Sequence, residues 1–216
     1  MANNINFTKQ LGAASSNSIA TSQSPGSAAL TLTSASVAID TFNASSNTAI
    51  GRRVILTSGG NDSGINWAVT GTINSGAIVT DTFAGSNGGA AQSNLDFVTV
   101  TNIVPSGAVA STVIAGTNGV GSSPWNTWNW QLSPPMNLGM AVELVSGAVN
   151  FTVQYTYDDP NNLPPGVNFP LPFTSIISAA SATTDGTIST PIIATRVLIN
   201  SGTGEIRCRF VQAGIG

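Results

Sequence analysis

The sequence predicts an all-β protein with an immunoglobulin-like β-sandwich fold, arranged as two sandwiches in tandem behind an N-terminal arm. Apolar residues recur with a period of two along much of the chain, and Gly- and Asn-rich turns separate these runs. No long stretch keeps a helical period without Gly, Pro or β-branched residues. A length of 216 residues gives ample material for the core of such a fold.

The N-terminal half predicts an arm and a first sandwich. Residues 1–27 are rich in Ser, Asn, Ala and Gln and poor in apolar residues, so we expect an extended arm that is loose alone and is ordered by a neighbouring chain. Residues 28–117 contain about seven short strands, enough for a small sandwich. Their clearest hairpin joins 65–73 to 77–83 across Asn74-Ser75-Gly76.

The C-terminal half predicts the second sandwich, residues 118–216. The Gly-, Asn- and Ser-rich stretch 116–124 is the best linker candidate. The most regular strand is 149–157, and its alternation predicts one buried face. Two further strands, 192–199 and 205–211, flank a hairpin turn at 200–204. The residues expected on the buried face are Val149, Phe151, Val153, Tyr155 and Tyr157.

The composition disfavours several classes of function. The chain has no histidine, one cysteine and 7% charged residues, so it lacks most groups that enzymes use for acid–base or nucleophilic chemistry. Its net charge is −3, and Arg52-Arg53 and Arg207/Arg209 form no basic patch, so we expect no nucleic-acid partner. No window approaches the roughly 20 apolar residues of a membrane helix, and the N-terminus does not resemble a signal peptide. The low charge suits a protein of a large assembly or of the cell exterior.

The acidic residues predict turns rather than catalysis. Asp158 and Asp159 are adjacent, so on an extended chain their side chains point apart and make a poor acid–nucleophile pair. A turn is the favoured interpretation, and a calcium site with Asn161 is the alternative. The stretch Asn61-Asp62-Ser63-Gly64 carries the same two interpretations. We expect no catalytic residue and no cofactor.

The strongest candidate for an interface or a ligand platform is the cluster of Trp125, Trp128 and Trp130. Indole rings mark interface hot spots and stack on ligands, but they also fill the space between two sheets. Core or inter-subunit packing is therefore the favoured interpretation, with a glycan platform as the alternative. Cys208 shares its parity with Ile206 and Phe210 and is expected to be a buried hydrophobe rather than a reactive thiol.

Several segments together resemble small structural proteins of tailed bacteriophages. They are GGNDSGINWAVTGT (59–72), the segment 81–104, GTNGVGSSPW (116–125), NFTVQYTYDDPNN (150–162), and INSGTG (199–204) with the QAGIG ending. Each is turn plus strand, and their order and spacing carry the resemblance, which leaves residues 1–49 outside it. The resemblance implies a place in the virus particle and brings no catalytic residues.

Two functional hypotheses follow. The first is a structural protein of a phage virion, a head decoration protein or a neck or tail accessory protein. It would be made in the host bacterial cytoplasm and would contact capsid, portal, neck or tail proteins and copies of itself. The second is a glycan-binding module of a receptor-binding tail fibre that uses Trp125, Trp128 and Trp130 to bind host glycan. The absence of a long fibrous or trimerising repeat favours the first.

Overall fold

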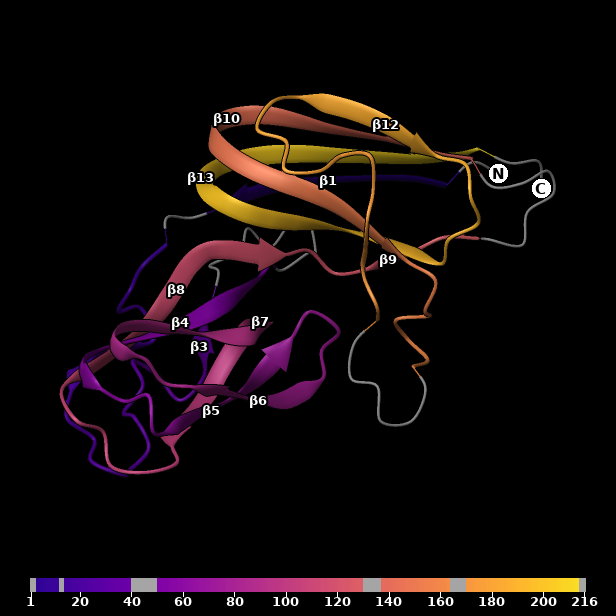
Figure 1. Cartoon of the computed structure of the whole chain (residues 1–216). Coiled ribbons are helices and arrows are strands. Elements are labelled where there is room, and N and C mark those ends of the chain that lie inside the picture. The colour runs from indigo at the N-terminus through magenta and orange to yellow at the C-terminus, as the bar shows by residue number, and fades with distance from the viewer. Residues whose placement is uncertain (1–2, 12–13, 40–49, 130–136, 164–169, 214–216) are drawn as a thin grey trace. The chain divides into compact units, whose positions relative to one another are not determined.

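A computed structural model describes residues 3–11, 14–39, 50–129, 137–163 and 170–213 of the chain. These residues form thirteen β-strands and no helix (Figure 1). The strand pairs described below are antiparallel, including Asn66–Ile73 with Ile78–Ala84, which a short turn joins, and Asn137–Thr156 with Ala194–Ala213, which are far apart in the sequence. The prediction of an all-β protein is confirmed.

The chain divides into two compact units whose boundaries differ from the expected tandem. The first unit comprises Ala13–Phe42 and Ala49–Gly121, and the second comprises Met1–Gly12, Asn43–Thr48 and Ser122–Gly216. The break between Gly121 and Ser122 lies close to the expected division at 117/118. The second unit, however, also includes the N-terminal segment Met1–Gly12.

The residues expected as a loose arm have partners within this chain. Strand β1 (Asn3–Leu11) pairs along its whole length with the strand that contains residues 204–212, whereas Ile19 and Ala20 are fully buried in the first unit. Strand pairing draws on backbone N–H and C=O groups, which every residue except proline supplies. The scarcity of apolar side chains therefore did not prevent this segment from pairing.

The first unit is built on a five-strand path with two short strands added. Strands β4 (Gly51–Asn61) and β5 (Asn66–Ile73) both pair with the long strand β7 (Asn87–Pro105), and β6 (Ile78–Ala84) pairs with β5. Strand β3 (Val37–Ala38) pairs with β7, and β2 (Ala20–Gln23) pairs with β8 (Val113–Ser122).

The expected hairpin is present in this unit. Strands β5 and β6 pair from Thr72 opposite Ile78 to Asn66 opposite Ala84, and Gly76 takes a positive φ of 83° in the turn. Trp67 and Val69 are buried in a core that also contains Phe97. The hairpin prediction is therefore confirmed, with its buried face packed against the rest of the unit.

The expected linker is largely strand. Residues 113–122 form β8, and two of its glycines, Gly116 and Gly121, lie where a side chain would collide with neighbouring backbone. A Cβ on Gly116 would meet the carbonyl oxygen of Ser15 at 2.0 Å, and one on Gly121 would meet that of Gly51 at 2.5 Å. These glycines permit close packing rather than flexibility, which their composition alone did not reveal.

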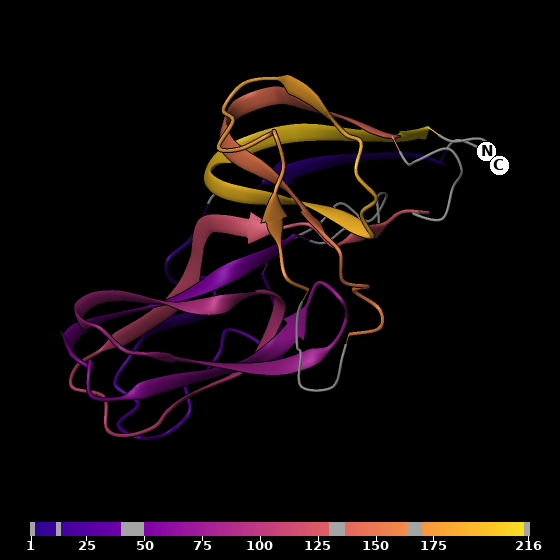
Figure 2. The same ribbon diagram turned by 45° about the vertical axis from the view of Figure 1, so that its right-hand side comes forward.

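The second unit is organised around two long strands. Strand β10 (Asn137–Thr156) pairs with β13 (Ala194–Ala213), and the short strands β9 (Asn126–Thr127), β11 (Phe173–Thr174) and β12 (Thr184–Ile188) pair with one or the other. Both long ribbons curve round together in two views (Figures 1 and 2).

The curve lies where the sequence predicted a hairpin turn. Residues 200–204 stay within β13, and the register between β10 and β13 shifts on both sides of this point. Gly202 has a φ of 105°, and a Cβ there would lie 2.2 Å from the carbonyl oxygen of Ala148. The Gly-rich signal therefore marks a curve with irregular pairing inside one continuous strand, and the predicted hairpin between 192–199 and 205–211 is wrong.

The expected buried face of 149–157 is correct for three residues and wrong for two. Val149, Phe151 and Val153 are at most 2% exposed, whereas Tyr155 is partly exposed and Tyr157 is 48% exposed. Strand β10 ends at the fully buried Thr156, so Tyr157 lies beyond the regular alternation. The two tyrosines consequently lie at the surface.

Candidate binding surface

Trp128 occupies the core position that the favoured interpretation of the Trp cluster expects. Trp128 is 5% exposed, and its Nε1 donates a hydrogen bond of 3.0 Å to the buried Oγ1 of Thr195. Its ring centroid lies 5.8 Å from that of Phe210. Trp128 is therefore a core residue whose polar atom is satisfied internally, as buried indoles require. Trp130 lies outside the described residues.

Trp125 is partly exposed and already has a cationic partner. The guanidinium carbon of Arg196 lies 4.7 Å from the centroid of its ring. Arg196 is held there by its Nε, which donates a 2.8 Å hydrogen bond to Oε1 of Gln154. This is cation–π geometry, within the roughly 6 Å at which such contacts are attractive. Trp125 thus stacks within its own unit.

A different group of rings lies at the surface of the second unit, and we call Tyr155, Tyr157 and Phe173 the aromatic surface. Tyr155 and Phe173 are direct partners in the β10–β11 pair, and their rings stack with centroids 5.6 Å apart. Tyr157 meets both rings edge-on, at 5.7 Å from Tyr155 and 5.4 Å from Phe173. These are favourable offset and edge-to-face arrangements. The sequence showed the tyrosines but assigned them to the core.

Large apolar side chains near Phe173 in the sequence are also exposed. Phe173 is 38% exposed and Leu171 is 60% exposed. Ile176, shortly after β11, is 76% exposed. Clustered exposed rings, such as Tyr157 and Phe173, commonly mark contact sites, whereas single exposed apolar residues need no explanation.

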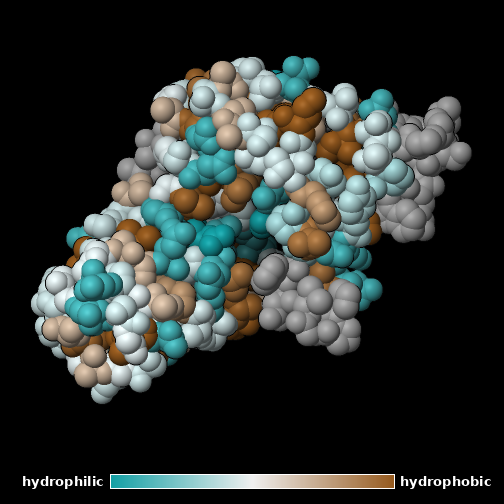
Figure 3. Space-filling model, viewed as in Figure 1, coloured by the Kyte–Doolittle hydropathy of each residue, from teal (hydrophilic) through white to brown (hydrophobic). Residues whose placement is uncertain are grey.

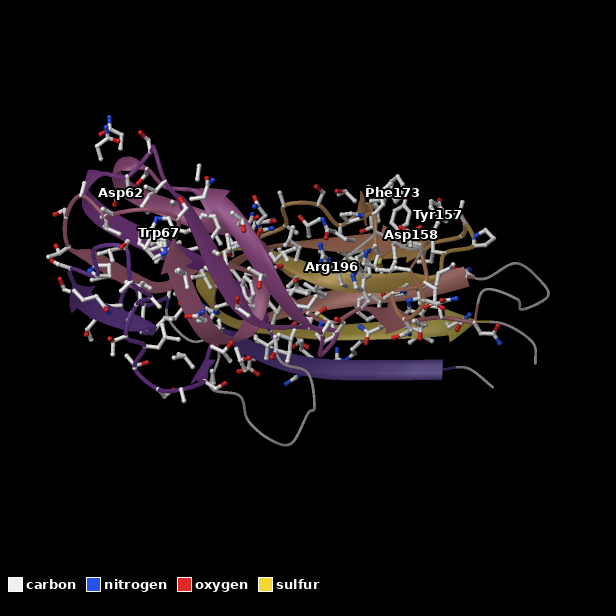
Figure 4. The ribbon with its side chains drawn as sticks, turned by 90° about the horizontal axis from the view of Figure 1, so that it is seen from below. Asp62, Trp67, Tyr157, Asp158, Phe173 and Arg196 are labelled. Carbon is white, nitrogen blue, oxygen red and sulfur yellow. The ribbon has the colours of Figure 1, made fainter. Side chains whose placement is uncertain are left out.

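The carboxylate of Asp158 adjoins the aromatic surface, and Asp159 is the next residue in the sequence. Asp158 follows Tyr157 directly, and its Oδ2 accepts a 2.7 Å hydrogen bond from the backbone N–H of Leu171. Figure 4 places Asp158 with Tyr157 and Phe173 at one end of the second unit. The Oδ1 of Asp159 accepts a hydrogen bond from the N–H of Asn161, as the turn interpretation predicted. Among the described residues, no group of three or more His, Cys, Asp or Glu residues is placed to hold a metal ion.

The ring cluster affects the acidity of one of its own members. The pKa of Tyr155 is raised above its ordinary value, first by desolvation and then by the charge of, and a hydrogen bond with, Tyr157. The neutral phenol of Tyr155 is therefore favoured beside its neighbour.

The second predicted acidic turn lies in the first unit and has a structural role. Oδ1 of Asp62 accepts a 2.8 Å hydrogen bond from the N–H of Ala110, and its carbonyl oxygen accepts one from the N–H of Ile65. Its side chain is buried, and Oδ2 has no hydrogen-bond partner. Asp62, labelled near Trp67 in Figure 4, thus ties two loops together.

Cys208 is a buried free cysteine on β13, as predicted. Burial raises the pKa of its thiol far above the ordinary value, so the thiolate needed for reaction or metal binding is disfavoured. The side chain serves as a small apolar group in the core. Phe210, two residues further along β13, is buried as well.

Comparison with known proteins gives no relative: no family model matches the chain, and no curated protein matches it. No helix in the described part of the chain has the length and apolar character to cross a membrane.

Proposed function

We propose that the protein is a structural component of a bacteriophage virion, a head decoration protein or a neck or tail accessory protein. It acts through protein–protein contacts and performs no catalysis. The order and spacing of the segments quoted above, from GGNDSGINWAVTGT to the QAGIG ending, support this role. We further propose that each of the two units is an immunoglobulin-like sandwich, which the antiparallel pairing and the buried core of each unit favour.

The observation that carries the proposal is a weakly charged surface with large apolar side chains on it. Soluble domains have on average about 25% charged residues, whereas this chain has 7%. Figure 3 shows brown apolar patches set among pale and teal residues. Among the residues whose burial the structure describes, the exposed large apolar ones are Ile78, Val145, Tyr157, Leu171, Phe173, Ile176 and Val211.

Ion pairing reduces the free charge of this surface further. Arg53 pairs with Asp96 at 2.7 Å, and Arg207 and Arg209 both reach Glu143 at 3.3 Å. A monomer relies on surface charge to resist association. A subunit that is covered by neighbours does not need it, so capsid, portal, neck or tail proteins and copies of the same chain are the partners that we propose.

The described Trp side chains give the glycan-binding alternative less support than the structural role. Trp128 is a core residue and Trp125 already stacks with Arg196. The aromatic surface offers other exposed rings to a sugar, and the titration proposed below includes that outcome.

The test is the protein content of purified particles. Gradient-purified virions of the phage that encodes the chain should contain it at a fixed copy number by mass spectrometry. A cryo-electron map of the same particles should then show two-unit β density at symmetry-related positions on the head, neck or tail. Detection in infected-cell lysate but not in purified virions would contradict the proposal.

A further inference from the structure

The aromatic surface has a geometry that determines what can bind to it. Its ring centroids lie 5.4–5.7 Å apart, so the rings fill the space between them and enclose no ligand. Only their outer faces and edges are available, and Tyr157 and Phe173 are the rings that solvent reaches most. A ligand must therefore lie flat against the cluster from outside.

The adjoining carboxylates determine the polarity of the ligand. Oδ2 of Asp158 accepts a hydrogen bond from the backbone N–H of Leu171, and Oδ1 of Asp159 accepts one from the N–H of Asn161. Neither takes part in an ion pair with a described residue. Ionised carboxylates only accept hydrogen bonds, so the complementary ligand must donate them. Two adjacent negative charges favour a cationic donor over a neutral one.

A guanidinium group meets both requirements. It is planar, stacks on aromatic rings, and has five N–H donors in a geometry that matches a carboxylate. This unit already contains such a contact, since Arg196 lies over Trp125 while its Nε donates to Gln154. A sugar ring also offers an apolar face and hydroxyl donors, but it carries no charge to match the aspartates.

We propose that the aromatic surface, together with Asp158, binds an arginine-bearing segment of a partner protein. The inference rests on the proposed function and specifies the chemistry of one partner. The arginine stacks against Tyr157 and Phe173, and its N–H groups reach the carboxylate of Asp158.

The test is an NMR titration of the full-length, ¹⁵N-labelled chain with acetyl-Gly-Arg-Gly-amide. Saturable shifts are expected in the amides of residues 155–159 and 171–175. The peptide in which citrulline replaces arginine keeps the shape but loses the charge, and it should give far smaller shifts. Raising the salt from about 0.05 M to about 0.5 M should weaken the arginine response, because ions screen exposed charges.

Three variants assign the effect. Asp158→Asn removes the charge and keeps an oxygen that can accept from Leu171, so the fold is retained while the peptide affinity falls roughly fivefold. Tyr157→Ala should lower the affinity by a similar factor through the lost stacking face. Asp185→Asn, at an exposed position of β12 that pairs with the far end of β10, makes the same charge change and should leave binding unaltered.

Contradiction would take one of three forms. These are the absence of shifts with the arginine peptide, equal shifts with the citrulline peptide, or shifts at these residues with N-acetylglucosamine or galactose in place of arginine. The titration needs no virion, so the two proposals fail separately. If the chain is present in virions but does not bind the peptide, only this inference is refuted. If the chain binds the peptide but is absent from virions, the proposed function is refuted.

Discussion

The second unit contains two groups of aromatic rings that pack at similar distances but differ in exposure. Trp128 and Phe210 lie 5.8 Å apart in the core, where they are 5% and 0% exposed. Tyr157 and Phe173 lie 5.4 Å apart at the surface, where they are 48% and 38% exposed. Ring–ring contact alone therefore does not distinguish a core cluster from a surface one.

The difference lies in what surrounds the rings. Trp128 has its Nε1 satisfied by Thr195, and β13 supplies Phe210 from inside the sheet. Tyr157 follows the end of β10, and β11, which contributes Phe173, has only two residues. The surface rings thus sit where regular pairing stops and no further strand of the described chain covers them. This position suits a contact with a partner.

The largest expected effect comes from truncating a core ring on β10. Phe151→Ala should cost about 3–5 kcal/mol of unfolding free energy, because it removes a fully buried aromatic and leaves a cavity. Urea denaturation of the purified variant measures the change. An unchanged midpoint would show that this part of β10 does not face a core.

Removing the internal hydrogen bond of the core pair should have a smaller effect. Trp128→Phe keeps an aromatic ring but leaves the buried hydroxyl of Thr195 without its donor, at a cost of about 1–3 kcal/mol. Trp125→Phe is the matched control, since Trp125 is partly exposed and should cost less. Equal losses in the two variants by denaturation would contradict the assignment of Trp128 to the core.

Cys208 predicts a pH dependence in the same core. Its pKa is raised in the folded state, so above the unfolded value of about 8.5 the unfolded chain loses a proton that the folded chain keeps. Stability should therefore be unaffected by this group below that pH and fall by about 1.4 kcal/mol per pH unit above it. Denaturation between neutral and alkaline pH should show a shallower fall in Cys208→Ala, and identical slopes would contradict burial of the thiol.

The smallest expected effect is at the surface. Tyr157→Ala should change the unfolding free energy by only about 0.5 kcal/mol, because nearly half of this side chain is already in solvent. The measurement is urea denaturation beside Phe151→Ala, which has the same parity in the sequence. A loss comparable to that of Phe151→Ala would mean that Tyr157 is part of the core.

The sequence predicted the parts of this unit that depend on regular alternation. Val149, Phe151 and Val153 were identified as buried because a strand within a sheet keeps its period of two. Tyr155 and Tyr157 were assigned to the same face because the alternating pattern continues past Thr156, where β10 ends, and so does not reveal the end of the strand. Thr156, fully buried at that end, is a polar residue that the pattern placed outside.

Other features depended on contacts between residues distant in sequence. The sequence predicted a linker from the glycines of β8. Only the structure shows that Ser15 and Gly51 pack against two of these glycines. The sequence alone could not decide between core and platform for Trp128, because its burial depends on Thr195 and Phe210. Phe173 could have been noticed as an aromatic beside Pro172, but its stacking on Tyr155 requires the pairing of β10 with β11.

Hydroxyl-radical footprinting of the chain alone and within purified virions tests the contrast between core and surface rings most directly. We expect strong modification of Tyr157 and Phe173 in the isolated chain, protection of both in the virion, and low modification of Phe151 and Trp128 in both states. Protection of Tyr157 in the isolated chain, or equal modification of Tyr157 in the two states, would contradict the account.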